Sequence, residues 1–161
     1  KDIMVEVNLV IIKEQPKARD ARIVLGAYAA ASDIERIGDY LKNFAKMMLK
    51  SSIEERKHQK LVEELLNEIE IRIKDTRAAF KDENHQLAKS IAKRDEEIDL
   101  LSNKLVADIN KLLEESLDKS EVKAYTRILI LSKTFERAGD HLVNICEQVS
   151  YIEKGQIYHY A

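Results

Sequence analysis

Apolar residues recur every three or four positions over most of this chain, which is the period of an amphipathic α-helix. No segment alternates between apolar and polar residues with period two, so we expect no β-strands. The sequence therefore predicts an all-α protein built from antiparallel bundles of long helices. The clearest apolar stripe consists of Val62, Leu66, Ile69, Ile73, Thr76 and Phe80.

Breaks in this pattern separate five helical stretches. The only proline, Pro16, marks a turn over residues 15–20, because helices usually end before the residue that precedes a proline. Ser120 is the expected N-cap of the last helix, and Gly155 its end. Residues 156–161 are expected to form a loosely held tail. The predicted helices cover approximately 1–14, 18–50, 52–81, 84–115 and 121–153.

One motif occurs twice, at positions 101 residues apart, and each copy has an Asn four residues after its Asp. The apolar positions around the two copies also match, which indicates a repeated unit of about a hundred residues. The two copies read Glu35-Arg36-Ile37-Gly38-Asp39 and Glu136-Arg137-Ala138-Gly139-Asp140.

The repeat divides the chain into two unequal parts. Residues 54–155 form a complete three-helix unit, and residues 156–161 are its tail. Residues 1–50 supply the end of the second helix and the whole third helix of an earlier copy. Because this first copy lacks its first helix, we expect its apolar stripes to face water unless other chain covers them. Lys1 has no cap before it, so we expect the natural polypeptide to extend upstream.

Acidic residues of the motif lie along one helix face at the border of the core, because positions i, i+4 and i+8 fall in one line. Asp95 and Asp99 form a further pair, which an antiparallel hairpin brings level with residues 136–140. Facing carboxylates from two helices favour a hard cation bound through oxygen. The partner acids of the first copy are missing. The predicted metal ligands are Glu35, Asp39, Asn43, Asp95, Asp99, Glu136, Asp140 and Asn144.

Two other interpretations of the acids stay open. Arg36 and Arg137 could pair with them in a purely structural bundle. A carboxylate-bundle metalloenzyme or iron store is the second alternative, but the Glu-x-x-His pairs of di-iron bundles are absent. We predict that His141 is a surface histidine, not a ligand. Gly38 and Gly139 each cost about 1 kcal/mol inside a helix, which suggests close approach of a neighbouring helix or a ligand.

Composition narrows the possible functions. The net charge is −2, from 27 basic and 29 acidic residues, which argues against a protein that binds nucleic acids through basic excess. Cys146 is the only cysteine, so we expect a buried small side chain and no Cys-based zinc site. No phosphate loop or nucleophile–base pair is present, so we expect no enzyme.

A solvated helix face is expected from Glu63, Glu64, Glu68 and Glu70 with Lys60, Arg72 and Lys74.

The two motif copies resemble the paired signature segments of the PhoU family. The second copy continues this resemblance through Asn144-Ile145-Cys146-Glu147. The turn at residues 15–22 resembles the family's Gln-Pro-x-Ala-x-Asp-Leu-Arg segment, with Ala21 in place of Leu, and residues 151–155 resemble its closing segment. The resemblance covers essentially the whole chain.

This resemblance implies two three-helix bundles related by pseudo-twofold symmetry, the first of them truncated at its N-terminus here. It implies a cytoplasmic regulator, held at the inner face of the membrane by its partners, that lowers phosphate uptake through contact with the phosphate transporter and a sensor histidine kinase. It also implies metal clusters at the acid pairs. We expect iron or zinc first, with manganese, magnesium or calcium as alternatives, and a homodimer. The cytoplasmic domain of a sodium/phosphate cotransporter carries similar modules and is an alternative.

Overall fold

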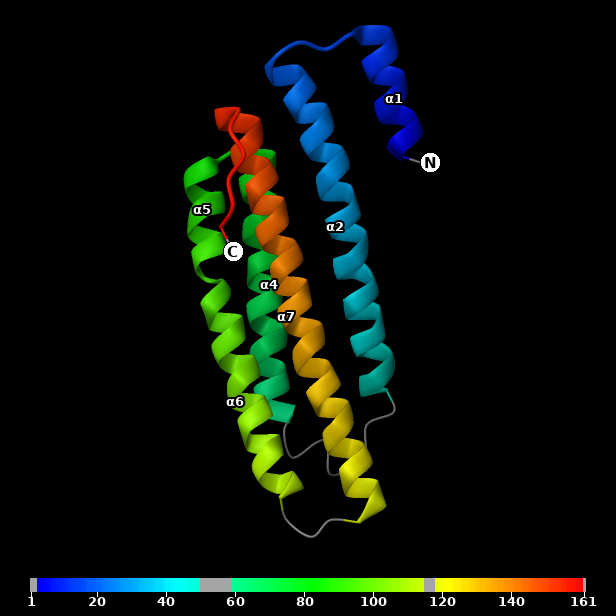
Figure 1. Ribbon diagram of the computed structural model, residues 1–161, viewed down its shortest axis with the longest axis vertical. Coiled ribbons are helices and arrows are strands. Elements are labelled where there is room, and N and C mark those ends of the chain that lie inside the picture. The colour runs from blue at the N-terminus through cyan, green and yellow to red at the C-terminus, as the bar shows by residue number, and fades with distance from the viewer. Residues whose placement is uncertain (1–2, 50–58, 115–117, 161) are drawn as a thin grey trace.

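The computed structural model describes residues 3–49, 59–114 and 118–160, and these residues are helical apart from short turns and the tail. No strand occurs among them, so the all-α prediction is confirmed. The break predicted at Ser51–Ser52 lies outside the described residues. The helices are α1 (Ile3–Glu14), α2 (Arg19–Met48), α4 (Gln59–Lys81), α5 (His85–Lys93), α6 (Asp95–Leu113) and α7 (Lys119–Lys154) (Figure 1).

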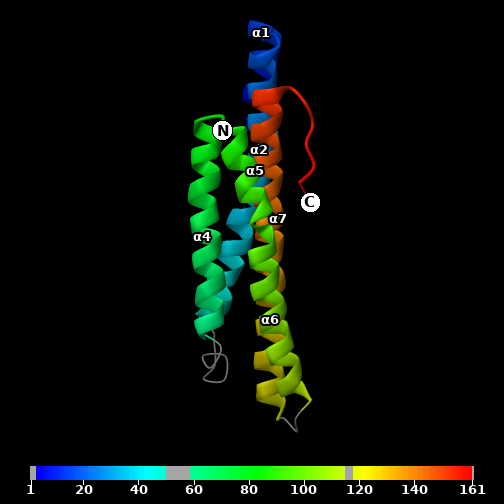
Figure 2. The same cartoon turned by 90° about the vertical axis from the view of Figure 1, so that its left-hand side faces the viewer.

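Helix α7 is the centre of the bundle, because it packs against α2, α4, α5 and α6. It runs antiparallel to α2 (Figure 1). Helices α5 and α6 follow one another along α7, with α4 beside them (Figure 2). The main core cluster includes Leu65, Ile98, Ile128 and Phe135, and the ring centroids of Phe135 and Phe44 lie 5.2 Å apart. Helices α2, α4, α6 and α7 therefore share the main core cluster, and α5 packs with α4 and α7 in a second one.

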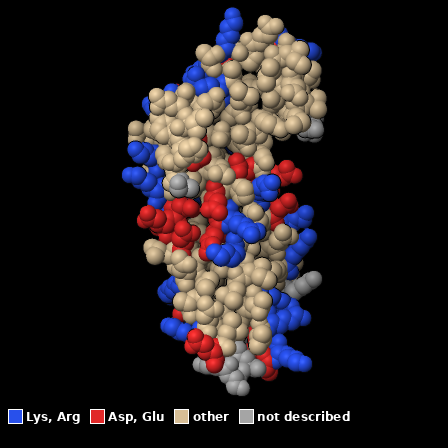
Figure 3. Space-filling view, viewed as in Figure 1, with Lys and Arg blue, Asp and Glu red and all other residues tan. Residues whose placement is uncertain are grey.

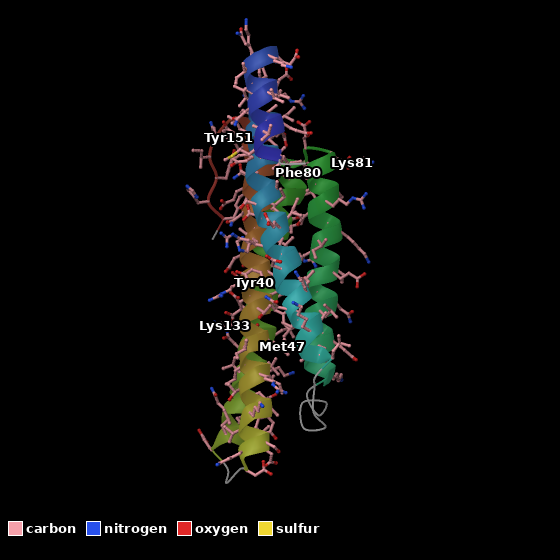
Figure 4. All side chains as sticks on the ribbon, turned by 90° about the vertical axis from the view of Figure 1, so that its right-hand side faces the viewer. Tyr40, Met47, Phe80, Lys81, Lys133 and Tyr151 are labelled. Carbon is pink, nitrogen blue, oxygen red and sulfur yellow. The ribbon has the colours of Figure 1, made fainter. Side chains whose placement is uncertain are left out.

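Helix α1 makes no comparable packing. It contacts α2, but none of its residues is buried. Its apolar side chains are mostly exposed, as expected for residues 1–50, but that expectation is wrong for α2, whose Ala30, Ile37 and Phe44 pack in the core cluster against α7. An apolar groove of about 610 Å³ opens nearby, lined mainly by α2, α4 and α7. Phe80, labelled in Figure 4, lies on its α4 side.

The N-cap of α7 is Asp118, so the prediction of Ser120 is wrong. The Asp118 side chain accepts hydrogen bonds from the backbone N–H groups of Ser120 and Glu121 at 2.7 and 3.0 Å. The Glu121 carboxylate accepts one from the backbone N–H of Asp118 at 3.1 Å. This reciprocal capping box starts the helix two residues earlier than a Ser120 cap. Gly155 ends α7 with φ 70°, as predicted.

The predicted helix over 84–115 is two helices that meet at Arg94. The backbone of Arg94 leaves helical geometry (φ −80°, ψ 2°). Its guanidinium binds Asp75 and Glu68 of α4, each at 3.0 Å. These ion pairs hold the break against α4. As a result, Asp95 starts α6, where an acidic side chain is favoured by the helix dipole.

Two residues of the C-terminal tail, Tyr158 and Tyr160, contact the bundle, whereas Ile157 and His159 are exposed. The Tyr160 hydroxyl lies 2.8 Å from Ser150 Oγ and 3.3 Å from His85 Nδ1. The Tyr160 N–H donates to Glu147 at 2.9 Å. Tyr158 packs against the His85 ring at 4.9 Å between centroids. Tyr158 and Tyr160 thus join the described part of the tail to α5 and α7.

Equivalent positions of the two motif copies meet at the α2–α7 boundary. Tyr40 and His141 are 101 residues apart, and their rings stack with centroids 5.7 Å apart. Tyr40 is labelled on α2 in Figure 4. Such a contact between equivalent residues on antiparallel helices is the arrangement that a local twofold axis produces.

Candidate functional site

Four of the acids predicted as metal ligands lie near one another at mid-height of the bundle. Asp95 and Asp99 lie at the start of α6, and Glu136 and Asp140 lie in the middle of α7. Burial raises the pKa of Asp99, and the charges of Asp95 and Glu136 raise it further. Burial likewise raises the pKa of Asp140, followed by the charges of Asp95 and Asp99. Acidic side chains gather over this part of α6 and α7 in Figure 3.

The close approach predicted at Gly139 is confirmed. A Cβ at Gly139 would lie 2.8 Å from Asp95 Oδ1 and 3.3 Å from Ile98 Cδ1, closer than real Cβ atoms tolerate without movement. Gly38 differs, because a Cβ there would meet no atom within 4 Å in the described structure. The expectation that a neighbouring helix approaches Gly38 is therefore wrong for the described residues, and the approach of a ligand there stays a prediction. In the second copy the glycine makes room for an acidic side chain.

The arginine that compensates the acids is Arg72, not Arg36 or Arg137. Arg72 Nη1 lies 2.6 Å from Asp95 Oδ1, and its side chain is only 1% exposed. Among the described residues, neither motif arginine forms an ion pair. The solvated face predicted for α4 is thus wrong at Arg72, because this side of α4 packs against α5 and α6. It holds for Lys74, whose exposed ion pair with Glu70 measures 2.6 Å.

The predicted ligands of the first motif copy lie on the surface, although Ile37 of that copy is buried. Glu35, Asp39 and Asn43 are all exposed. Asp99, Asp140 and Asn144 are exposed as well. Within the described ranges, no three His, Cys, Asp or Glu side chains stand close enough together to hold a metal ion. In the second copy, Asp95 binds Arg72 and Glu136 binds Lys133. Two of the four gathered acids are therefore held by basic side chains.

His141 is not a free surface histidine, so that prediction is wrong. Its Nδ1 lies 2.7 Å from Asp33 Oδ1, and its side chain is largely buried. The Asn144 amide donates to the same Asp33 oxygen at 3.2 Å. Asp33 was missed because it stands outside the repeated motif, where the second copy has Thr134. Together these residues join α2 to α7.

Removing the crowded acids is expected to stabilise the metal-free protein near neutral pH. Because the folded-state pKa values of Asp99 and Asp140 are raised, their contribution to stability is full below the ordinary Asp pKa and is lost as pH rises through the raised values. The double variant Asp99→Asn/Asp140→Asn removes the repulsion within two pairs of acids, Asp95/Asp99 and Glu136/Asp140. Its free energy of unfolding should therefore rise by about 0.5 kcal/mol for each of these pairs at pH 7 and change little at pH 4. Urea unfolding with chelator measures this, and Asp108→Asn on α6 is the control that should show no such pH-dependent gain.

Comparison with known proteins identifies the family. A family model described as the PhoU domain matches residues 1–48 and 62–149. The chain belongs to the PhoU domain family. It is 31% identical over 160 residues to the phosphate-specific transport system accessory protein PhoU homolog of Clostridium acetobutylicum, covering 97% of the chain and 71% of that protein. It is 33% identical over 147 residues to the Rhizobium meliloti homolog, covering 90% of the chain and 61% of that protein.

A solved structure agrees with this assignment. The crystal structure of the phosphate transport system regulatory protein PhoU from Streptococcus pneumoniae matches with a TM-score of 0.74 and 26% identity, over 97% of this chain and 73% of that one. The family resemblance is thus confirmed, and with it the expectation of a non-enzymatic protein, since these PhoU relatives are accessory and regulatory proteins. No described helix is both long and apolar enough to cross a membrane. The chain spans 61% to 71% of the length of the two relatives above.

Proposed function

We propose that this chain is a metal-binding regulatory adaptor that lowers phosphate uptake and phosphate-starvation signalling. It acts in the cytoplasm, as a dimer, through contact with the phosphate transporter and a sensor histidine kinase. The observation that supports this most is its match, over 97% of its length, to an accessory protein of a phosphate-specific transport system. Because the match is to a regulatory family, the role rests on contact surfaces and a bound cation instead of catalysis.

The same proposal includes two tandem PhoU-type repeats, with residues 1–50 as the partial first one. Support comes from the paired motifs and from the stacking of the equivalent residues Tyr40 and His141. A second sign of local symmetry is that α2 and α7, which carry the two motifs, run antiparallel (Figure 1). In this organisation α2 and α7 are the corresponding third helices of the two repeats.

The cation would be held by Asp95, Asp99, Glu136 and Asp140. The donor chemistry suits iron, manganese, magnesium and calcium, which accept carboxylate oxygens. In the described residues no three such side chains stand close enough together to hold an ion, so cation binding would require these side chains to move toward one another. Burial, and after it the charges of neighbouring acids, raise the pKa values of Asp99 and Asp140, and a cation would offset the repulsion between these acids. The first copy offers Glu35, Asp39 and Asn43 on the surface, without a facing acid pair in the described part of the chain. We therefore place the cation in the complete repeat.

Cation binding is expected to raise the melting temperature of the parent protein and not that of Glu136→Ala/Asp140→Ala. A ligand at a hundred times its Kd stabilises the folded state by about 2.7 kcal/mol. For a chain of this size, about 2–4 °C accompany each kcal/mol. Thermal unfolding with chelator and then with excess Mn²⁺, alongside elemental analysis of protein purified without chelator, gives the comparison. Equal melting of both proteins under both conditions, with no metal retained, would remove the cation from the proposal.

The regulatory part is tested in cells. A strain that lacks its own copy of this protein should show raised phosphate-starvation reporter activity, and the parent sequence should restore repression. The Glu136→Ala/Asp140→Ala variant should restore it only weakly if the cation is needed. Failure of the parent sequence to restore repression, at normal expression, would contradict the regulatory role.

A further inference from the structure

Helix α1 carries apolar side chains on two opposite faces. It packs against α2, and Val7, the partly buried residue of α1, marks the face toward that helix. The opposite face carries Val5, Leu9 and Ile12, at the i, i+4 and i+7 spacing of one helical stripe. These three side chains, the outward stripe, are 54%, 46% and 71% exposed. A helix that is apolar all round is normally buried on all sides, but the described structure leaves the outward stripe open to solvent.

The complete repeat shows that a three-helix unit does not need such a stripe. The inward residues of α1 match an apolar series on α6 that lies 102 residues later, one more than the offset of the motif, and packs in the main core cluster. The matched pairs are Ile3 and Leu105, Val7 and Ile109, Val10 and Leu112, and Ile11 and Leu113. In this register the outward stripe matches three exposed residues of α6, namely Ala107, Lys111 and Glu114. Because the equivalent face of the complete unit meets water with charged side chains, the outward stripe of α1 indicates a contact beyond its own repeat.

Charged residues of opposite sign flank the outward stripe along one edge. Glu6 and Lys13 are about two helical turns apart, so they lie on the same side of α1, next to the stripe. When two such helices pack antiparallel with their Leu9 side chains opposite one another, the same edge of each helix faces the other. Glu6 of each molecule then lies within about 1.5 Å, one residue's rise, of the level of Lys13 in the other molecule. Val5 and Ile12 come level across the contact in the same way. One twofold arrangement therefore matches the apolar residues and brings opposite charges together twice.

We propose that this chain self-associates through the outward stripe, with α1 packing antiparallel against α1 of a second molecule about a twofold axis. This inference rests on the dimer in the proposed function and assigns its interface. Helix α1 stands at the edge of the bundle (Figure 1), where mostly uncharged surface is open to another molecule (Figure 3). A membrane surface fits less well, because interfacial helices are rich in Lys and Arg, whereas α1 has Lys13 as its only basic residue against Glu6 and Glu14.

The contact is small. A helix of 12 residues is about 18 Å long, so two paired α1 faces fall at the low end of interface sizes, where associations are weak and transient. We therefore expect a dissociation constant on the order of tens of micromolar.

Sedimentation equilibrium of the parent and its variants, from micromolar to several hundred micromolar protein, tests the apolar part of this contact. Ile12→Gln should weaken the dimer on the order of tenfold, because the substitution counts twice in a symmetric pair. Leu100→Gln on α6 is the matched control, since its side chain is 69% exposed against 71% for Ile12 and lies outside the proposed contact. The control should leave the dissociation constant within about twofold of the parent value.

The charged edge is tested by exchanging its two residues. Glu6→Lys and Lys13→Glu each place like charges opposite one another at two points, and each should weaken the dimer about fivefold at low salt. The combined variant Glu6→Lys/Lys13→Glu restores opposite charges across the contact and should return the dissociation constant to within about twofold of the parent value. Circular dichroism of each variant checks that the bundle is folded.

The outcomes separate this interface from the proposed function. A parent dimer that Ile12→Gln weakens and that the exchanged charge pair restores supports the antiparallel contact. A parent dimer that Ile12→Gln leaves unchanged overturns the α1 interface, while the dimer itself stands. A parent that stays monomeric at every concentration overturns the self-association, and binding of that monomer to phosphatidylglycerol vesicles would assign the stripe to a membrane surface instead. In either case, repression by the parent sequence in the reporter strain would still support the regulatory role.

Discussion

Replacing Phe135 by Ala is expected to lower the free energy of unfolding by about 3–5 kcal/mol, as for other buried aromatic residues truncated to Ala. Phe135 is 1% exposed and lies in the core cluster that joins α7 to α2, α4 and α6. Its ring contacts Phe44 at 5.2 Å between centroids, so truncation leaves a cavity and removes an aromatic pair. Urea unfolding followed by circular dichroism measures the loss.

The control is the equivalent position of the first motif copy. Ile34 stands 101 residues before Phe135 and is 60% exposed. Ile34→Ala should therefore change stability by no more than about 0.5 kcal/mol. A comparable loss in both variants would contradict the assignment of Phe135 to the core and of Ile34 to the surface.

The two motif glycines are expected to respond to alanine with opposite signs. Gly38→Ala should stabilise the protein by about 1 kcal/mol, because the new Cβ meets no atom within 4 Å and alanine favours the helix. Gly139→Ala gains the same helix propensity of about 1 kcal/mol but should lose about 1–3 kcal/mol to overpacking, because its Cβ would press on Asp95 Oδ1, which Arg72 holds in place. We expect a net loss of about 1 kcal/mol. Thermal unfolding of both variants in chelator gives the two signs directly.

The Gly139 effect has an internal check. Asp95→Ala removes the carboxylate that a Cβ at position 139 would meet, so the cost of Gly139→Ala should shrink in that background. An unchanged cost would place the strain on Ile98 instead, whose Cδ1 is 3.3 Å from the same point.

Much of the helix content and the acid pairing follow from the sequence alone. The apolar period places helices close to their observed bounds, because burial of one stripe is a local property of the chain. The turn at Pro16, the end of α7 at Gly155 and the burial of Cys146 follow in the same way. Residues 95–99 and 136–140 meet because helix rise and loop length fix the register of a hairpin.

The contacts between helices at the candidate site could be established only from the tertiary structure. From the helix pattern alone, Arg72 is predicted on a solvated face of α4. In the structure α5 and α6 cover its side chain, and its guanidinium pairs with Asp95 of the acid cluster. Asp33 and His141 could be paired only after α2 and α7 were placed side by side. Local sequence determines which face of a helix is apolar and which positions repeat. How closely each of the two similar motifs is packed depends on the surrounding helices. These bury Ala138 and Gly139 of the second copy, whereas in the first copy Ile37 is buried and Gly38 is exposed.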